Sequence, residues 1–197
     1  MIGNKRTVPM NKRLIPQELL CKILKCIPET GELFWRERTS DLFSNSARAN
    51  CWNSRWPGKP ALATIDGVTG YKHGDIFYRK HYAHRVVWAM ETGAWPVDHI
   101  DHINHDRADN RIANLREVTR VENGKNLSIS KLNTSGVTGV CWCKTSQKWH
   151  ARIVVEKRKI HLGYFDAKKD AINARAAANI KYKFHENHGR KNNGRST

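Results

Sequence analysis

The sequence predicts an α+β protein in which short antiparallel strands are interleaved with a few helices. Apolar residues recur at helical spacing over residues 17–27, 84–91 and 167–184. β-branched and aromatic residues cluster instead in short runs over residues 33–36, 61–82 and 136–165. Glycine and proline separate many of these runs, which is typical of turns.

Positive charge dominates the composition, because 35 Lys and Arg residues face 18 Asp and Glu residues, giving a net charge of +17. This charge indicates a polyanionic partner, with nucleic acid as the first choice and anionic membrane a weak second. The sequence contains neither a long apolar stretch nor the apolar core of a signal peptide. We therefore predict a soluble cytoplasmic protein that does not associate with membranes.

The five cysteines are odd in number and contain no Cys-x-x-Cys pair, which argues against a disulfide framework and against a zinc ribbon. The acidic residues are concentrated in the middle of the chain. Residues 97–126 carry 5 basic and 6 acidic side chains, whereas residues 136–197 carry 14 and 4. The middle of the chain is therefore the part suited to a cation, and the two ends are suited to DNA.

The N-terminal half is expected to support a site rather than to form one. Residues 1–13 are polar and expected to be flexible. A helix is expected after Pro16 and ends at Pro28, and a turn over residues 29–32 leads to a strand at 33–36. Residues 38–60 are expected to be irregular. Residues 61–82 predict a hairpin, followed by a helix over 84–91 that Gly93 and Pro96 end.

Carboxylate, imidazole and carboxamide groups recur between Val97 and Asn126 with few large apolar residues among them. Asp101 and His102 end a short β-compatible run, and Asn114 follows a polar loop. Thr119 and Glu122 have the spacing of a capping box, which predicts a helix start just before Asn123. The stretch therefore predicts a strand, a loop, a second strand and a short helix.

The run DHINHDRADNRIANLR followed by T-x-x-E-N-x-x-N resembles the HNH endonucleases, specifically the small phage-type enzymes in which asparagine replaces the last histidine. The resemblance implies a ββα-metal fold. It implies that His102 is the general base, that Asp101 and Asn123 hold one Mg²⁺ or Mn²⁺ ion, and that Asn114 braces the loop and orients His102. Histidine suits proton abstraction near neutral pH, and oxygen ligands suit a hard cation.

This stretch has two other interpretations. His99, His102 and His105 recur every third residue, which on a helix would suggest a zinc site, but the surrounding residues are poor helix formers. A register three residues earlier would make His99 the base, although the spacing to Asn114 and Asn123 matches the family only from His102. In the loop, Arg107 and Arg111 are candidates for phosphate contacts, with ion pairs to Asp106 and Asp109 equally open. Arg116 lies on the second strand, close enough to help stabilise the leaving group, and is a candidate DNA contact rather than a catalytic residue.

Beyond a polar linker at residues 131–135, the sequence predicts three strands and a helix capped by Asp166. The pieces GV-x-W, KW-x-A-x-I and LG-x-F with an alanine-rich helix resemble the Apetala-two, or ethylene-response-factor, domain. That resemblance implies that the outer face of the sheet binds DNA. The candidate residues on that face are Trp142, Lys144, Trp149, Arg152, Arg158 and Lys159. A protein-binding role for this module is the alternative.

The predicted organisation is thus a nuclease domain at residues 14–130, the linker, a DNA-binding domain at 136–184 and a basic disordered tail at 185–197. The predicted function is metal-dependent hydrolysis of double-stranded DNA by a phage homing-type enzyme that nicks one strand as a monomer, without a small-molecule cofactor. The alternative is a non-catalytic DNA-binding regulator that retains a decayed nuclease core.

Overall fold

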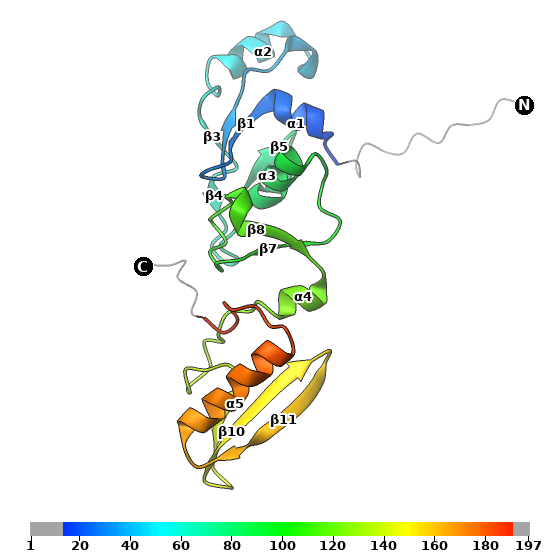
Figure 1. The fold of residues 1–197 in the computed structure, drawn as a ribbon. Coiled ribbons are helices and arrows are strands. Elements are labelled where there is room, and N and C mark those ends of the chain that lie inside the picture. Colours follow the sequence, from blue (N-terminus) through cyan, green and yellow to red (C-terminus); the bar gives the residue numbers. More distant parts are fainter. Residues whose placement is uncertain (1–13, 191–197) are drawn as a thin grey trace, which may run out of the picture. The chain divides into compact units, whose positions relative to one another are not determined.

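The computed structural model describes residues 14–190, which form two compact units (Figure 1). The N-terminal unit contains residues 14–96 together with Asn110–Ile112, and the C-terminal unit contains residues 97–109 and 113–190. Small antiparallel sheets and helices make up both units, which confirms the predicted α+β class. The expected flexible N-terminus at residues 1–13 lies outside the described residues.

The N-terminal unit is built from two small sheets and the helices around them. Its elements are α1 (Gln17–Ile23), β1 (Leu24–Ile27), β2 (Glu32–Trp35), the 3₁₀ helix η2 (Ser40–Leu42), α2 (Ser46–Asn53), β3 (Pro60–Ala61), β4 (Thr64–Ile65), β5 (Lys72–Ile76), β6 (Arg79–Tyr82) and α3 (Ala83–Thr92). The first sheet has the order β1-β2-β3 and the second β4-β5-β6. The expected helix over 84–91 is confirmed as α3, and Gly93 ends it with a positive φ of 83°.

Three elements of this unit differ from the expectation. The helix expected up to Ile27 ends at Ile23, and residues 24–27 form β1, because pairing with β2 satisfies their backbone. Part of the segment expected to be irregular forms α2, which Asn45 caps by accepting a hydrogen bond from the Arg48 N–H at 2.9 Å. The region expected to form one hairpin, residues 61–82, contains the three strands β4, β5 and β6, because Phe77 and Tyr78 adopt positive φ and turn the chain between β5 and β6.

The C-terminal unit begins with the strand, loop, strand and helix that the sequence predicts. These are β7 (His99–His102), the 3₁₀ turn η3 (Ile112–Asn114), whose first residue belongs to the other unit, β8 (Leu115–Val118) and α4 (Arg120–Gly124). Thr119 and Glu122 form the predicted capping box at the start of α4. Because His99 to His102 is a strand, three histidines cannot line one helical face, and the zinc interpretation is wrong.

The remainder of this unit is a three-stranded antiparallel sheet with one helix packed on it (Figure 1). Its elements are β9 (Val140–Cys143), β10 (Lys148–Val155), β11 (Arg158–Phe165) and α5 (Lys168–Lys181). Val140, Ala151 and Ala171 form the centre of the core between sheet and helix. Asp166 does not cap α5 as expected. It pairs instead with Lys148 at 3.2 Å, and Ala167 occupies the N-cap position.

Residues 182–190 follow α5 in a series of turns. The sequence predicts a disordered tail from residue 185, whereas residues 185–190 lie within the described chain and bond to residues 125–129. The rest of that tail, residues 191–197, lies outside the described residues. Between residues 14 and 190, no helix has the length and apolar character needed to span a bilayer.

Candidate active site

The β7–β8 hairpin places Asp101 and His102 side by side at the end of a buried strand. In the antiparallel register, Asp101 lies opposite Arg116 and His102 opposite Leu115. Ile100, Leu115 and Val118 are buried and hold the hairpin in place. Asp101 and His102 are themselves only 8% and 3% exposed. Polar groups so deeply buried need partners or a function.

Asn114 ties together the two ends of the loop between these strands. Its side-chain oxygen accepts a hydrogen bond from the Asn104 N–H at 3.0 Å, and its amide donates to the Asp109 carbonyl at 2.8 Å. Its backbone carbonyl also accepts the Ile103 N–H at 2.9 Å. The loop therefore leaves β7 in a fixed direction immediately after His102.

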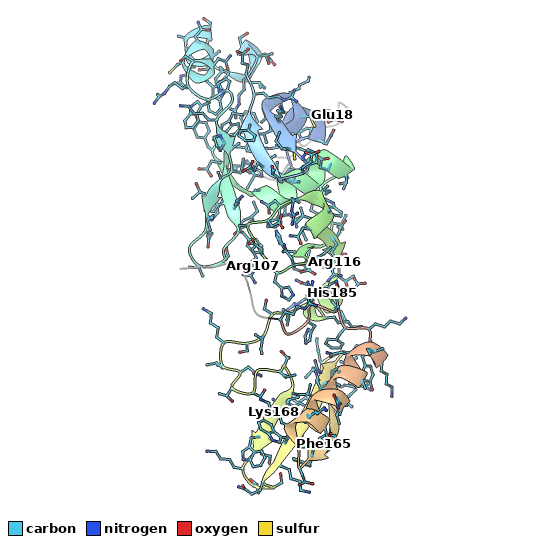
Figure 2. All side chains as sticks on the ribbon, turned by 60° about the vertical axis from the view of Figure 1, so that its left-hand side comes forward. Glu18, Arg107, Arg116, Phe165, Lys168 and His185 are labelled. Atoms are coloured by element: carbon cyan, nitrogen blue, oxygen red, sulfur yellow. The ribbon has the colours of Figure 1, made fainter. Side chains whose placement is uncertain are left out.

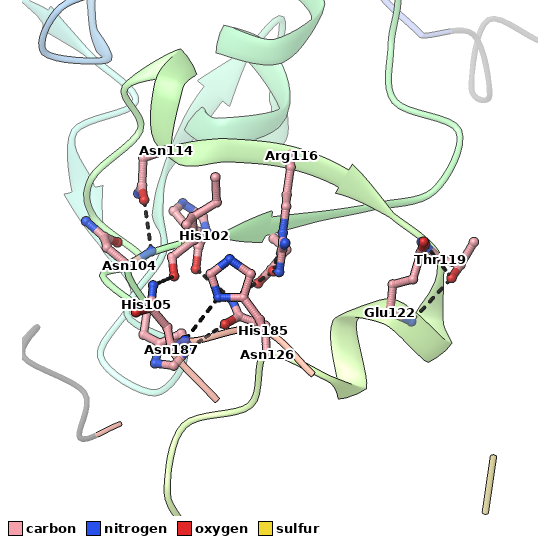
Figure 3. A network of polar contacts seen from close by, with 12 residues as sticks. His102, Asn104, His105, Asn114, Arg116, Thr119, Glu122, Asn126, His185 and Asn187 are labelled. Atoms are coloured by element: carbon pink, nitrogen blue, oxygen red, sulfur yellow. Dashed lines mark hydrogen bonds and ion pairs between the residues drawn. The ribbon is translucent and has the colours of Figure 1, made fainter. Parts of the chain in front are cut away.

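The Asp101 carboxylate is oriented by three donors that converge on one oxygen. Arg116 donates to Oδ2 from Nε at 3.0 Å and from Nη2 at 2.7 Å, and Asn126 Nδ2 donates at 2.9 Å (Figure 3). Oδ1 accepts no hydrogen bond from residues 14–190. One carboxylate oxygen is thus held by the protein, and the other remains for a further partner.

Asn126 extends this arrangement into a buried chain of hydrogen bonds. Its Oδ1 lies 2.9 Å from Nε2 of the buried His105, and its Nδ2 also reaches the His102 carbonyl at 3.3 Å. The residue is 3% exposed. The sequence analysis gives Asn126 no role. Its position as the last residue of the T-x-x-E-N-x-x-N run is the sequence feature that could have indicated one.

The site offers few protein ligands for a hard cation such as Mg²⁺. Among residues 14–190, no group of three or more His, Cys, Asp and Glu side chains is arranged to hold a metal. Asn123 lies half-buried in α4, and its side chain makes no hydrogen bond within the described chain. One carboxylate oxygen and one carboxamide oxygen nevertheless suit Mg²⁺, which keeps several water ligands and needs few from the protein. The pair of Asp101 and Asn123 as ligands stays a prediction.

Two further side chains reach the site from the far end of the chain. Asn187 Nδ2 donates to the carbonyl of Ile103, which follows His102, at 2.8 Å. His185 lies beside Arg116 in both figures that label the two residues (Figures 2 and 3). Burial, followed by the positive charge of Arg116, lowers the pKa of His185 below its usual value. Sequence reasoning missed both residues, because nothing in their local sequence links them to residues some 80 positions earlier.

The predicted DNA-contacting residues differ in exposure and in the face of the sheet on which they lie. Arg107 and Arg111 are exposed, whereas Arg116 is engaged by Asp101. Arg152 and Lys159 lie on the sheet face opposite α5, and Lys144 is exposed just after β9. The outward placement expected for Trp149 is wrong, because Trp149 packs against the core under α5, where Lys168 lies 5.2 Å from its ring. Register places Trp142 opposite Trp149 on that same face, and Arg158 lies opposite Val155, also on the α5 side.

The outer face of the sheet also carries a cluster of imidazole, phenol and thiol side chains. His150 and His161 are joined by a 2.9 Å contact between Nε2 and Nδ1, and both rings stack or tilt against Tyr164. The sulfur of Cys141 lies 3.8 Å from His150 Nδ1. Burial and the neighbouring His161 lower the pKa of His150. Arg152 and Lys159 flank this aromatic cluster.

Comparison with known proteins finds a family match over the region that contains the β7–β8 hairpin. The HNH endonuclease family matches residues 81–125, a range that includes Asp101, His102, Asn114 and Asn123. Protein 3.8 of Escherichia phage T7 is 32% identical over 84 residues, which cover 42% of this chain and 69% of that protein. No solved structure matches significantly. With the strand, loop, strand and helix on which Asp101 and His102 are held, these matches establish that the chain belongs to the HNH endonuclease family.

Proposed function

We propose that this protein is a metal-dependent DNA endonuclease in which His102 activates the attacking water, and Asp101 and Asn123 hold one divalent ion, Mg²⁺ or Mn²⁺. The observation that carries the proposal is the Asp101 carboxylate. It is buried, fixed through one oxygen by three donors, and adjacent in sequence to a buried histidine. The family match over the same residues supports this reading.

Each residue has a distinct task in this proposal. The imidazole of His102 takes the proton from water, for which histidine is suited near neutral pH. Asn114 keeps the loop after His102 in one conformation, and Arg116 and Asn126 prevent the Asp101 side chain from rotating. A bound divalent ion would relieve negative charge on the phosphate and on the leaving oxygen. The protein contributes position and orientation.

A plasmid-nicking assay tests the catalytic assignment. The parent should convert supercoiled plasmid to the nicked form only when Mg²⁺ or Mn²⁺ is present, and His102→Ala should lose at least about 100-fold in rate. His99→Ala is the matched control, because His99 is on the same strand but exposed, and it also tests the earlier register. If His102→Ala cut as fast as the parent, or if His99→Ala were the inactive variant, the assignment of His102 would be refuted.

We also propose that the sheet of β9, β10 and β11 binds duplex DNA through its outer face, as the resemblance to Apetala-two domains implies, and so supplies affinity to a homing-type nuclease that nicks one strand as a monomer. Arg152 and Lys159 on that face support this proposal, as does the basic charge of residues 136–197. Trp149, which packs on the other face, is not part of the proposed surface. The alternative, a non-catalytic regulator, is not favoured by the family match.

Point variants test this surface better than a truncation, because residues 185–190 bond to the nuclease hairpin region and would be lost with the module. Arg152→Ala should weaken DNA binding and lower the slope of log affinity against log salt by about 0.9. Lys169→Ala on the exposed side of α5 is the control and should leave the slope unchanged. Equal slopes for both variants would remove Arg152 from the proposed surface.

A further inference from the structure

The C-terminal segment, residues 185–190, is fixed against the chain that leaves α4. The His185 N–H donates to the Lys125 carbonyl at 3.1 Å, and the Gly189 N–H donates to the Leu127 carbonyl at 2.8 Å. The Ile129 N–H in turn donates to the Arg190 carbonyl at 3.1 Å. These backbone hydrogen bonds hold the segment beside residues 125–129, whose first member precedes Asn126.

Two histidines of this segment differ in what surrounds them. His188 packs edge-on against Phe184, with ring centroids 4.7 Å apart, and its Nδ1 is buried. Packing against Phe184 and a hydrogen bond with the Lys125 backbone account for that residue. His185 is directed instead to the nuclease site, where its ring lies beside Arg116 (Figure 3) and interacts electrostatically with Asp101. Its proximity to Arg116 is also evident in Figure 2.

Hydrogen bonding fixes which nitrogen of His185 can act as a donor. The backbone N–H of Asn187 donates to His185 Nδ1 at 3.1 Å, so Nδ1 must carry a lone pair. The proton of the neutral ring is then on Nε2, and Nε2 has no partner within residues 14–190. Asn187 is itself anchored, because its side chain donates to the Ile103 carbonyl at 2.8 Å. The ring therefore offers one free N–H donor at the site.

Space for a substrate strand lies beside the C-terminal segment, at residues other than His185 itself. A solvent-open hollow beside the segment is lined in part by His105, Asn187, Gly189 and Arg190. Arg190 adds positive charge at the end of the segment. A phosphate placed against the open Oδ1 side of Asp101, with the intervening cation, would need donors for its non-bridging oxygens, and donors fixed in advance are the effective ones.

We propose that His185 is a phosphate-contacting residue of the nuclease site, whose Nε2–H donates a hydrogen bond to a non-bridging oxygen of the scissile phosphate. This inference rests on the proposed nuclease function and adds to it a residue outside the family motif. It makes the C-terminal module a contributor to the active site as well as to DNA affinity. Asn187 is the positioning residue, because it fixes both the segment and the tautomer of His185.

Cleavage by a matched set of variants tests the proposal. His185→Ala should reduce the single-turnover rate of plasmid nicking about 100-fold, the effect of removing one preorganised donor. His185→Gln should recover part of the rate, since its amide can also donate. Glu186→Ala, at the exposed neighbouring position, should cut like the parent. Thermal melting by circular dichroism would verify that each variant is folded.

A second measurement does not depend on cleavage. Diethyl pyrocarbonate modifies accessible imidazoles, and mass spectrometry can follow His185 in the full-length parent with and without a duplex oligonucleotide in metal-free, low-salt buffer. Contact with phosphate should slow modification of His185 at least several-fold. The exposed His99 provides an internal reference in the same sample.

The outcomes separate the two proposals. If the parent nicks DNA and His185→Ala nicks as fast as Glu186→Ala, the role of His185 is overturned while the nuclease assignment stands. If the parent fails to nick DNA with every metal ion and at every pH tested, the nuclease proposal fails. The modification data then decide the role of His185: protection by DNA supports the phosphate contact, and equal modification with and without DNA overturns it.

Discussion

Asn126 provides the most informative test of the site, because it contacts Asp101, the backbone of His102 and His105, and the first two residues carry the proposed chemistry. Replacing it by alanine removes the donor to Asp101 Oδ2 and to the His102 carbonyl, and the partner of His105 Nε2. All of these lie in buried surroundings. With a net contribution of about 0.5–1.5 kcal/mol for each hydrogen bond, Asn126→Ala should destabilise the C-terminal unit by roughly 2–4 kcal/mol.

Urea denaturation provides the assay for this loss. With a typical slope for a domain of this size, a loss of this magnitude moves the unfolding midpoint by roughly 1–2 M. Trp142 and Trp149 lie in the C-terminal unit, so variants that retain only these tryptophans allow fluorescence to report on that unit alone. Far-UV circular dichroism would follow the whole chain in parallel.

Asn123→Ala is the control, since Asn123 makes no side-chain hydrogen bond within the described chain. Its effect on stability should stay within about 0.5 kcal/mol, while the Mg²⁺ concentration needed for half-maximal nicking should rise if Asn123 is a ligand. Equal midpoints for Asn126→Ala and the parent would refute the reasoning that the buried network fixes Asp101. A large loss of stability in Asn123→Ala would refute the assignment of a structural role to Asn126 and a metal-binding role to Asn123.

Three further perturbations follow from other parts of the structure. Gly31→Ala should cost roughly 3 kcal/mol or more, because Gly31 has a φ of +67° and an added Cβ would stand 2.1 Å from the Asn110 carbonyl carbon; a urea midpoint equal to the parent's would contradict this. Arg38→Ala should destabilise the N-terminal unit by about 2 kcal/mol and change tryptophan fluorescence, since the buried guanidinium lies 3.7 Å from the centre of the Trp52 ring. Burial lowers the pKa of His188 from 6.5 to about 4, so the unfolded chain binds its proton first, and stability should be full above pH 6.5 and fall as the pH drops toward 4. His188→Phe should flatten that part of the stability–pH profile, and an unchanged profile would exclude His188 as its source.

Much of the site's local structure could be predicted because its signals lie close together in the sequence. The capping box of Thr119 and Glu122 fixes where α4 starts, and the short β-compatible run that ends at Asp101 and His102 predicts β7. These features depend on neighbours within a few residues. The same holds for α3, whose apolar face and terminal glycine are both local signals.

The parts that could not be predicted depend on pairing across long separations. Residues 24–27 continue a helical apolar pattern, yet they become a strand because β2 folds back on them. The resemblance to Apetala-two domains implies an outward Trp149, whereas the register with Trp142 and the core under α5 place it inside. His185 joins the site only because residues 125–129 accept the returning chain. Sequence periodicity carries no information about such distant partners.

The hydrogen bonds between residues 125–129 and the C-terminal segment also close the intervening chain into a loop. The connection at residues 131–135 is consequently not a free tether, because the other end of the module is fastened to the same place. If the sheet binds DNA as proposed, the span between the bound stretch and the cut phosphate is set by the protein. Cleavage sites should then lie at a constant number of base pairs from the occupied sequence, a spacing that longer linkers would leave unaltered.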